Sequence, residues 1–98
     1  MEIKIQAVHF DATEKLNEYV EKKVGKLAKY CEEATEVAVH MSVVKPQTAM
    51  NKEVAVSVHV PGNTLRVEKV CDTFEEAVDQ CVDAMKVQLE RLKEKHRG

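Results

Sequence analysis

Every second residue from Val54 to Val60 is valine, and the residues between the valines are small or polar. This period of two is typical of a strand with one buried face, because successive side chains point to opposite sides of a sheet. The segment Pro61-Gly62-Asn63 follows directly and predicts a tight turn, since glycine or asparagine can take a positive φ. The chain therefore contains a half-buried strand that turns back into a neighbouring strand.

Three other segments alternate with the same period and are rich in aliphatic side chains. Residues 45–51 separate two of the four segments and predict a hairpin-type loop, because Pro46 lacks the N–H that a strand ladder needs. The expected strands are residues 2–8, 37–43 and 54–60, and a shorter fourth strand from Leu65 to Val70 or Cys71.

Residues 14–30 show the helical period instead, with apolar side chains on one stripe. A capping signal precedes them, because the side chain of Asp11 or Thr13 can accept a hydrogen bond from the free N–H groups of the first turn. Tyr19 and Tyr30 flank the stripe, where a ring can pack inward while its hydroxyl stays in water. The stripe consists of Leu16, Val20, Val24, Leu27 and Cys31.

A second helix is expected to start at Phe74. Glu76 follows Thr73 in capping-box spacing, which marks a helix N-terminus. Apolar side chains continue on one face to about Leu92, after which the sequence is charged and we expect the helix to trail off.

The expected order is β-α-β-β-β-α, so the fold class is α+β. With 98 residues and no linker, the chain should form one domain, with a single four-stranded sheet and both helices packed on one face. The helix between the first two strands permits a right-handed parallel crossover, and the other strand pairs are hairpins. No apolar run approaches the roughly 20 residues of a membrane helix, so we expect a cytoplasmic protein without a membrane partner.

The sequence offers little for catalysis or metal binding. It has no GxSxG, P-loop or HExxH motif, and its three cysteines have no CxxC spacing and are expected to be small buried apolar residues. His40 and His59 could neighbour one another across the sheet, but two imidazoles without a third ligand more often indicate exposed strand residues. Asp79 and Asp83 similarly indicate a solvated helix face. We expect no enzymatic activity, metal, cofactor or small-molecule substrate.

The net charge of -2 gives no sign of a nucleic-acid partner, so only the distribution of charge could indicate one. Four lysines of the first helix form one ridge, which is either a solvated face, with Glu18 and Lys22 paired, or an edge that contacts phosphates. Gly25 flanks the ridge and either lets RNA approach closely or is simply tolerated there. The ridge consists of Lys15, Lys22, Lys26 and Lys29.

The second helix is acidic before Met85 and basic after it. The helix dipole alone could explain this polarity. However, Lys86, Lys93 and Arg97 share one side and could lie on the same outer surface as the ridge of the first helix.

Two motifs carry a resemblance to a known family. The first is Tyr19-Val-Glu-Lys22-Lys23-Val-Gly-Lys26-Leu27-Ala-Lys29-Tyr30, and the second is Thr73-Phe-Glu-Glu-Ala77-Val78-Asp79. Together with the order of elements and the basic helix end that contains Gln88-Leu89, they resemble the ribosome hibernation-promoting factor family. The chain looks like the short form, which lacks the C-terminal dimerisation domain of the long form.

The resemblance implies a fold similar to the double-stranded RNA-binding domain with an added N-terminal strand, and one ribosome-binding domain over residues 1–98. Members of the family bind the rRNA of the small ribosomal subunit near the decoding centre. There they block messenger RNA and the A- and P-site tRNAs, and they silence ribosomes in stationary phase. The resemblance implies the same partner and the same translation inhibition for this chain, and it leaves open whether ribosome dimers form with another factor.

The basic positions of the family match Lys23, Lys26 and Lys29 of the first helix and Arg91 of the second. Two further positions that are usually basic hold Ala84 and Val87, and Lys86 and Lys93 stand nearby as partial substitutes. The expected rRNA-binding residues are Lys22, Lys23, Lys26, Lys29, Lys86, Arg91 and Lys93.

The alternative is a non-enzymatic protein-interaction module of the same α+β fold, which would bind a polypeptide through its exposed sheet face or a patch at Val87. The negative net charge is compatible with this alternative. Salt dependence separates the two, because phosphate contacts release counterions and an apolar contact releases few.

Overall fold

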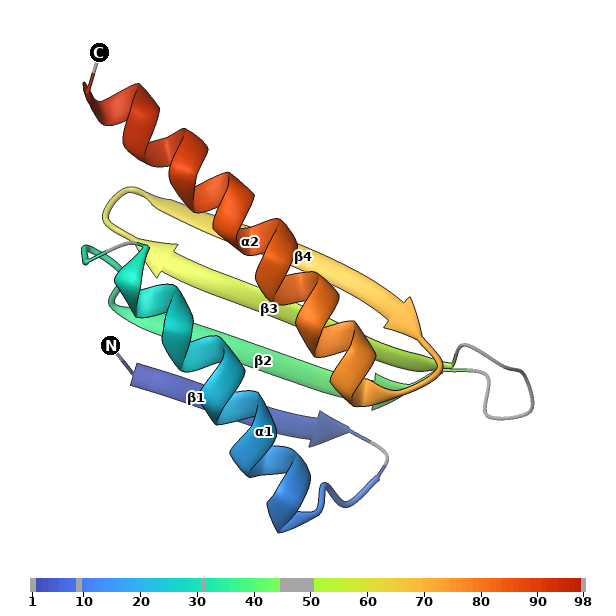
Figure 1. Cartoon of the computed structure of the whole chain (residues 1–98). Helices are drawn as coiled ribbons and strands as arrows, with labels where there is room; N and C mark the ends of the chain where they lie inside the picture. The colour runs from blue at the N-terminus through green and yellow to red at the C-terminus, as the bar shows by residue number, and fades with distance from the viewer. Residues whose placement is uncertain (1, 9, 31, 45–50, 98) are drawn as a thin grey trace.

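The computed structural model describes residues 2–8, 10–30, 32–44 and 51–97, and side chains as far as residue 92. A four-stranded sheet forms one layer and two helices form the other (Figure 1). The expected β-α-β-β-β-α order and the α+β class are confirmed. The elements are β1 (Glu2–Val8), α1 (Glu14–Gly25), the 3₁₀ helix η1 (Lys26–Lys29), β2 (Glu36–Val43), β3 (Lys52–Val60), β4 (Asn63–Cys71) and α2 (Phe74–Arg97).

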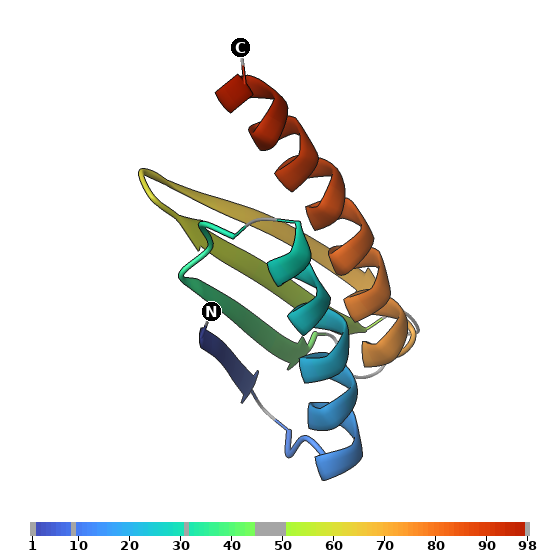
Figure 2. The same cartoon turned by 60° about the vertical axis from the view of Figure 1, so that its left-hand side comes forward.

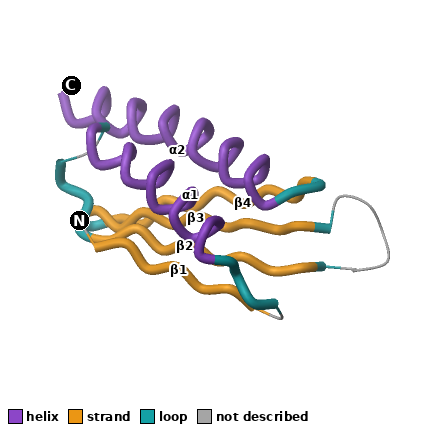
Figure 3. Tube along the Cα trace, turned by 60° about the horizontal axis from the view of Figure 1, so that its bottom comes forward, coloured by secondary structure: helices purple, strands orange, loops and turns teal. Residues whose placement is uncertain are grey.

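The strands lie in the order β1-β2-β3-β4, so neighbours in sequence are neighbours in the sheet. β1 and β2 are parallel and are joined through α1, whereas β2, β3 and β4 pair antiparallel. Both helices cover the same face of the sheet, with α2 over β3 and β4 and α1 beside it (Figures 2 and 3). The opposite face of the sheet is not covered by either helix.

The two helices begin where the capping residues predict. The Thr13 hydroxyl accepts a 3.1 Å hydrogen bond from the Leu16 N–H, and the Thr73 hydroxyl accepts one of the same length from the Glu76 N–H. Each cap satisfies a backbone donor that the first turn leaves free and stabilises its helix by roughly 1 kcal/mol.

The core lies between the sheet and the helix layer. The expected stripe is buried at Leu16, Val20 and Val24 of α1 and at Leu27 of η1, while Cys31 lies outside the described residues. These side chains pack with the inward valines of β2 and β3 and with the apolar face of α2. Burying each such side chain contributes about 1.5 to 3 kcal/mol, which fixes the position of α1 against α2.

Two of the cysteines behave as expected. Cys71 and Cys81 are free and buried, and the Cys81 thiol donates to the carbonyl of Val54 at 3.3 Å. Burial raises the pKa of the Cys81 thiol to about 12. Both residues therefore serve as small core side chains.

Three expectations about length are wrong. An α-helix was expected over residues 14–30, but the α-helix ends at Gly25 and the chain continues as a 3₁₀ helix. The change occurs at Gly25 because glycine has a poor α-helical propensity. β4 is as long as β3, at nine residues, because the tight turn at Gly62 lets pairing begin at once between Val60 and Asn63. α2 continues to Arg97 rather than trailing off after Leu92, since lysine, glutamate and arginine have a high intrinsic helix propensity.

Within the residues that the structure describes, neither helix has both the length and the apolar character that crossing a bilayer demands.

Candidate nucleic-acid interface

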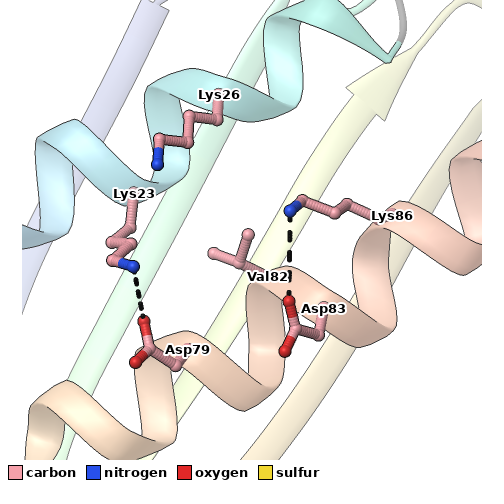
Figure 4. Close-up of a pocket in the computed structure, with 6 residues that line it drawn as sticks. All are labelled: Lys23, Lys26, Asp79, Val82, Asp83 and Lys86. Carbon is pink, nitrogen blue, oxygen red and sulfur yellow. Dashed lines mark ion pairs between the residues drawn. The ribbon is translucent and has the colours of Figure 1, made fainter.

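The two helices enclose a hollow of about 180 Å³ on the outer side of the helix layer (Figure 4). The buried side chain of Val82 gives it an apolar base, and charged side chains surround this base. Since α1 and η1 supply one wall and α2 the other, the site depends on how the two helices pack. The lining residues are Lys23, Lys26, Asp79, Val82, Asp83 and Lys86, and we call this site the interhelical hollow.

Lys23 lies against α2 rather than extending freely into solvent. Its Nζ atom is 3.4 Å from Asp79 Oδ1 and 5.6 Å from the centre of the Tyr19 ring. The Tyr19 hydroxyl donates a 2.9 Å hydrogen bond to the same Oδ1 atom. The ring of Tyr19 packs against the core as expected, and its hydroxyl, which was expected to contact water, has Asp79 as a partner across the helix interface.

The contacts of Tyr19 change its acidity. Desolvation by burial, together with the hydrogen bond to Asp79 and the negative charge of that carboxylate, raises the pKa of Tyr19 to about 12. Tyr19 is therefore a neutral hydrogen-bond donor throughout the physiological pH range.

Lys86 closes the other side of the interhelical hollow. Its Nζ atom lies 4.0 Å from Asp83 Oδ1 and 5.4 Å from the centre of the Tyr30 ring. Tyr30 is thus placed to hold an ammonium group by a cation–π contact. Lys26 forms no ion pair within the described ranges, so its ammonium group is available to an anion.

The interhelical hollow gathers three ammonium groups around two carboxylates, which gives it a net charge of +1 (Figure 4). Lys23 comes from α1, Lys26 from η1 and Lys86 from α2, so an anion at the hollow would contact both sides of the helix layer. Lysine ammonium groups spaced along a helix edge suit the phosphates of a nucleic-acid backbone.

The structure brings only some of the expected rRNA-binding residues together. Lys23, Lys26 and Lys86 meet at the interhelical hollow, whereas Lys22 and Lys29 are exposed on α1 and η1 without lining it. In the described part of the chain no ion pair joins Glu18 to Lys22.

Arg91 lies elsewhere. It lines a second hollow, of about 160 Å³, with Leu65 at the start of β4 and Leu92 on α2. Five residues separate it from Lys86, which turns it by about 140° round the helix, away from α1. The side chain of Lys93 lies outside the described residues.

Sequence reasoning missed the role of the two aspartates. Asp79 and Asp83 were expected on a solvated face, and Asp83 is indeed 79% exposed, but both also line the interhelical hollow and face lysines. The available signal was that Asp79 lies three residues before the buried Val82 and so flanks the core stripe of α2. Its partners on α1, Tyr19 and Lys23, are 60 and 56 positions away in sequence, and no local pattern could identify them.

The histidines do not form the pair that was considered. His40 lies opposite Ala55, whereas His59 lies opposite Glu36, so the strand register separates the two imidazoles. His59 contacts Glu36 at 3.4 Å and Thr64 at 3.0 Å instead. The described ranges contain no group of three or more His, Cys, Asp or Glu side chains that could hold a metal ion.

Comparison with known proteins gives one family. The model of the Sigma 54 modulation protein / S30EA ribosomal protein family matches residues 3–97. The chain is 32% identical over 100 residues to a ribosome hibernation promotion factor of a Picosynechococcus species, and this match covers the whole chain and 52% of the relative. A ribosome hibernation promoting factor of Pseudomonas putida is 27% identical over 98 residues, with 92% of the relative covered. The chain thus spans about half the length of the first of these relatives and most of the second.

Two solved structures have a similar fold. The N-terminal domain of Thermus thermophilus Protein Y superposes with a TM-score of 0.78 at 28% identity, covering 94% of this chain and 99% of that domain. A ribosomal subunit interface protein of Coxiella burnetii gives a TM-score of 0.84 at 24% identity, with 95% and 98% of the two chains covered. The second likeness concerns the fold alone.

Proposed function

The chain belongs to the Sigma 54 modulation protein / S30EA ribosomal protein family, and we propose that it is a ribosome hibernation factor. It binds the rRNA of the small ribosomal subunit near the decoding centre and excludes messenger RNA and the A- and P-site tRNAs. The inhibition is steric and requires no catalytic step. The names of the relatives from Picosynechococcus and Pseudomonas putida support this proposal.

The observation that carries the proposal is the meeting of Lys23, Lys26 and Lys86 at the interhelical hollow. Each ammonium group that neutralises a phosphate releases condensed counterions, which provides affinity for RNA of any sequence. The shape of the folded rRNA then provides specificity, because both helices must fit the same stretch of backbone. Lys22 and Lys29 extend the basic surface along the exposed side of α1 and η1.

The negative net charge is compatible with this function because several exposed acidic residues lie outside the interhelical hollow. Glu32 and Glu33 are exposed in the loop after η1, and Glu75 and Glu76 are exposed in the first turn of α2. RNA bound at the interhelical hollow would contact the lysine-rich side and leave these carboxylates in solvent.

Co-sedimentation with separated bacterial ribosomal subunits tests the proposal. The protein is expected to pellet with the small subunit at low salt and to be released at moderately raised salt. It should also reduce binding of P-site tRNA to small subunits in a filter assay. Failure to pellet with the small subunit, or unaffected tRNA binding by subunits saturated with the protein, would contradict the proposal.

A protein-interaction module of the same fold is the second candidate. Val87 is 46% exposed on α2, and such an apolar side chain on a helix surface favours contact with a polypeptide. Binding that persists at raised salt, and that Val87→Lys abolishes, would favour this candidate. The ribosome-binding proposal expects Val87→Lys to retain or strengthen binding, because it adds a cation to α2.

A further inference from the structure

We propose that Asp79 is an internal competitor of RNA: an incoming phosphate must displace its carboxylate from Lys23, so Asp79 limits the affinity of the interhelical hollow. This inference rests on the proposed function, since it concerns how the same surface binds rRNA. Competition with RNA would explain why a carboxylate lies inside a basic site, where neither helix capping nor core packing requires one.

The contact between Lys23 and Asp79 is open to exchange. The two side chains are 33% and 44% exposed and their charged atoms are 3.4 Å apart. Ion pairs at such exposed positions contribute little to the free energy of folding. A phosphate that reaches the interhelical hollow can therefore replace Asp79 as the ion-pair partner of Lys23 without unfolding either helix.

The Asp79 carboxylate keeps a second contact when Lys23 turns away from it. The Tyr19 hydroxyl, which remains protonated, donates to Asp79 Oδ1 at 2.9 Å and anchors the carboxylate from the opposite helix. When Lys23 turns to a phosphate, the negative charge of Asp79 stays beside the bound anion. The repulsion between these two charges lowers affinity.

Asp83 provides a natural comparison within the same hollow. Its side chain is 79% exposed, and its carboxylate lies 4.0 Å from Lys86 (Figure 4). Among the residues that the structure describes, no tyrosine hydroxyl donates to it. Such a carboxylate can rotate into water when a phosphate arrives, and water screens its charge strongly. Of the two aspartates, Asp79 should therefore have the larger effect on binding.

The test is the affinity of Asp79→Asn for purified small ribosomal subunits at low salt. The substitution removes the charge but keeps an oxygen that accepts the Tyr19 hydrogen bond. Relief of one charge repulsion over roughly 6 Å, at an effective dielectric constant of about 40 to 80, should tighten Kd by about 3- to 10-fold. Asp83→Asn should give a smaller gain.

Glu68→Gln is the matched control for the change in net charge. Glu68 is 47% exposed and lies 3.4 Å from Arg66, much as Asp79 lies from Lys23, but it is on β4, away from the interhelical hollow. This variant should bind within twofold of the unaltered protein. A general effect of net charge would instead strengthen binding equally in both variants and would overturn the inference.

The salt dependence distinguishes competition from a structural role. When a phosphate displaces a carboxylate from its lysine, the carboxylate takes up a cation from solution. RNA binding then releases fewer ions in total. In Asp79→Asn the slope of log K against log salt should therefore become steeper by up to about one unit. A second variant, Tyr19→Phe, removes the anchor and keeps the charge, so its gain in affinity should be smaller than that of Asp79→Asn.

Equal or weaker binding by a folded Asp79→Asn, as judged by its thermal melt, would overturn the inference and would show that Asp79 only orients Lys23. In that case binding by the unaltered protein leaves the proposed function intact. If no variant and not even the unaltered protein binds small subunits, the proposed function fails and the inference with it.

Discussion

The Tyr19 hydroxyl on α1 donates a 2.9 Å hydrogen bond to Asp79 on α2. The two residues are sixty positions apart in sequence, and their contact joins the two helices above the core. It also fixes one wall of the interhelical hollow, because Asp79 is in turn paired with Lys23.

Tyr19→Phe should lower the free energy of unfolding by about 1 kcal/mol, since it removes a hydrogen bond to a charged acceptor at a half-buried position. Urea denaturation measures this change. Tyr30→Phe is the matched control and should cost less than about 0.5 kcal/mol, because the Tyr30 ring contacts Lys86 through its face and keeps that contact as phenylalanine. Equal losses in the two variants would contradict a specific role for the Tyr19 hydroxyl.

The same hydrogen bond predicts a dependence on alkaline pH. The pKa of Tyr19 is raised to about 12 in the folded chain from an ordinary value of 10.0, so the neutral form is favoured by folding. Its contribution to stability is complete below about pH 10 and is lost as pH rises towards 12.

Absorbance titration of Tyr30→Phe isolates this group, because the chain has only two tyrosines. The midpoint should lie near 12 while circular dichroism remains native. A midpoint near that of free tyrosine, with the fold intact, would contradict the burial of Tyr19 against Asp79.

Gly25→Ala should raise the free energy of unfolding by about 0.5 to 1 kcal/mol, because Gly25 ends α1 in a helical conformation where alanine is preferred. A Cβ atom at this position would meet nothing within 4 Å, so no clash opposes the gain. Chemical denaturation gives the stability, and small-subunit binding is measured alongside it. Unchanged affinity identifies Gly25 as a tolerated glycine, whereas a fall in affinity indicates that RNA approaches the backbone there.

Much of the fold could be predicted because each element is encoded locally. Alternating valines specify β3 and its buried face, and Thr13 and Thr73 mark the helix starts. The predicted ends of β4 and α2 were wrong because they depend on more than the apolar periodicity of the segment itself. β4 is long because β3 supplies a full-length pairing partner, and α2 outlasts its apolar face because its charged residues favour a helix.

The site was predicted less completely than the fold. The helical wheel correctly places basic residues on outer surfaces, but it cannot say which surfaces face each other. The packing of α1 against α2 brings Lys86 to Lys23 and turns Arg91 towards the start of β4. It also brings Asp79 to Lys23, which no pattern within one helix could reveal.

Binding to small subunits should depend strongly on salt. If about five phosphates of a partly single-stranded surface are neutralised, the slope of log K against log salt should be roughly -3 to -5. Lys86→Ala and Lys93→Ala should each make the slope shallower by a little under one unit. A nearly flat dependence, unaffected by these two changes, would favour contact with a polypeptide.

The central claim is that the lysines of the interhelical hollow bind the small ribosomal subunit. Its most direct test is the Kd of a triple Lys23→Gln, Lys26→Gln, Lys86→Gln variant for purified small subunits. The matched control replaces Lys4, Arg66 and Lys69 of the sheet by glutamine, which removes the same charge from residues that do not line the hollow. We expect the first triple variant to lose about 100-fold in affinity, since each phosphate contact is worth roughly 1 kcal/mol, and the control to stay within about threefold. A folded first triple variant that binds as tightly as the control would contradict the claim.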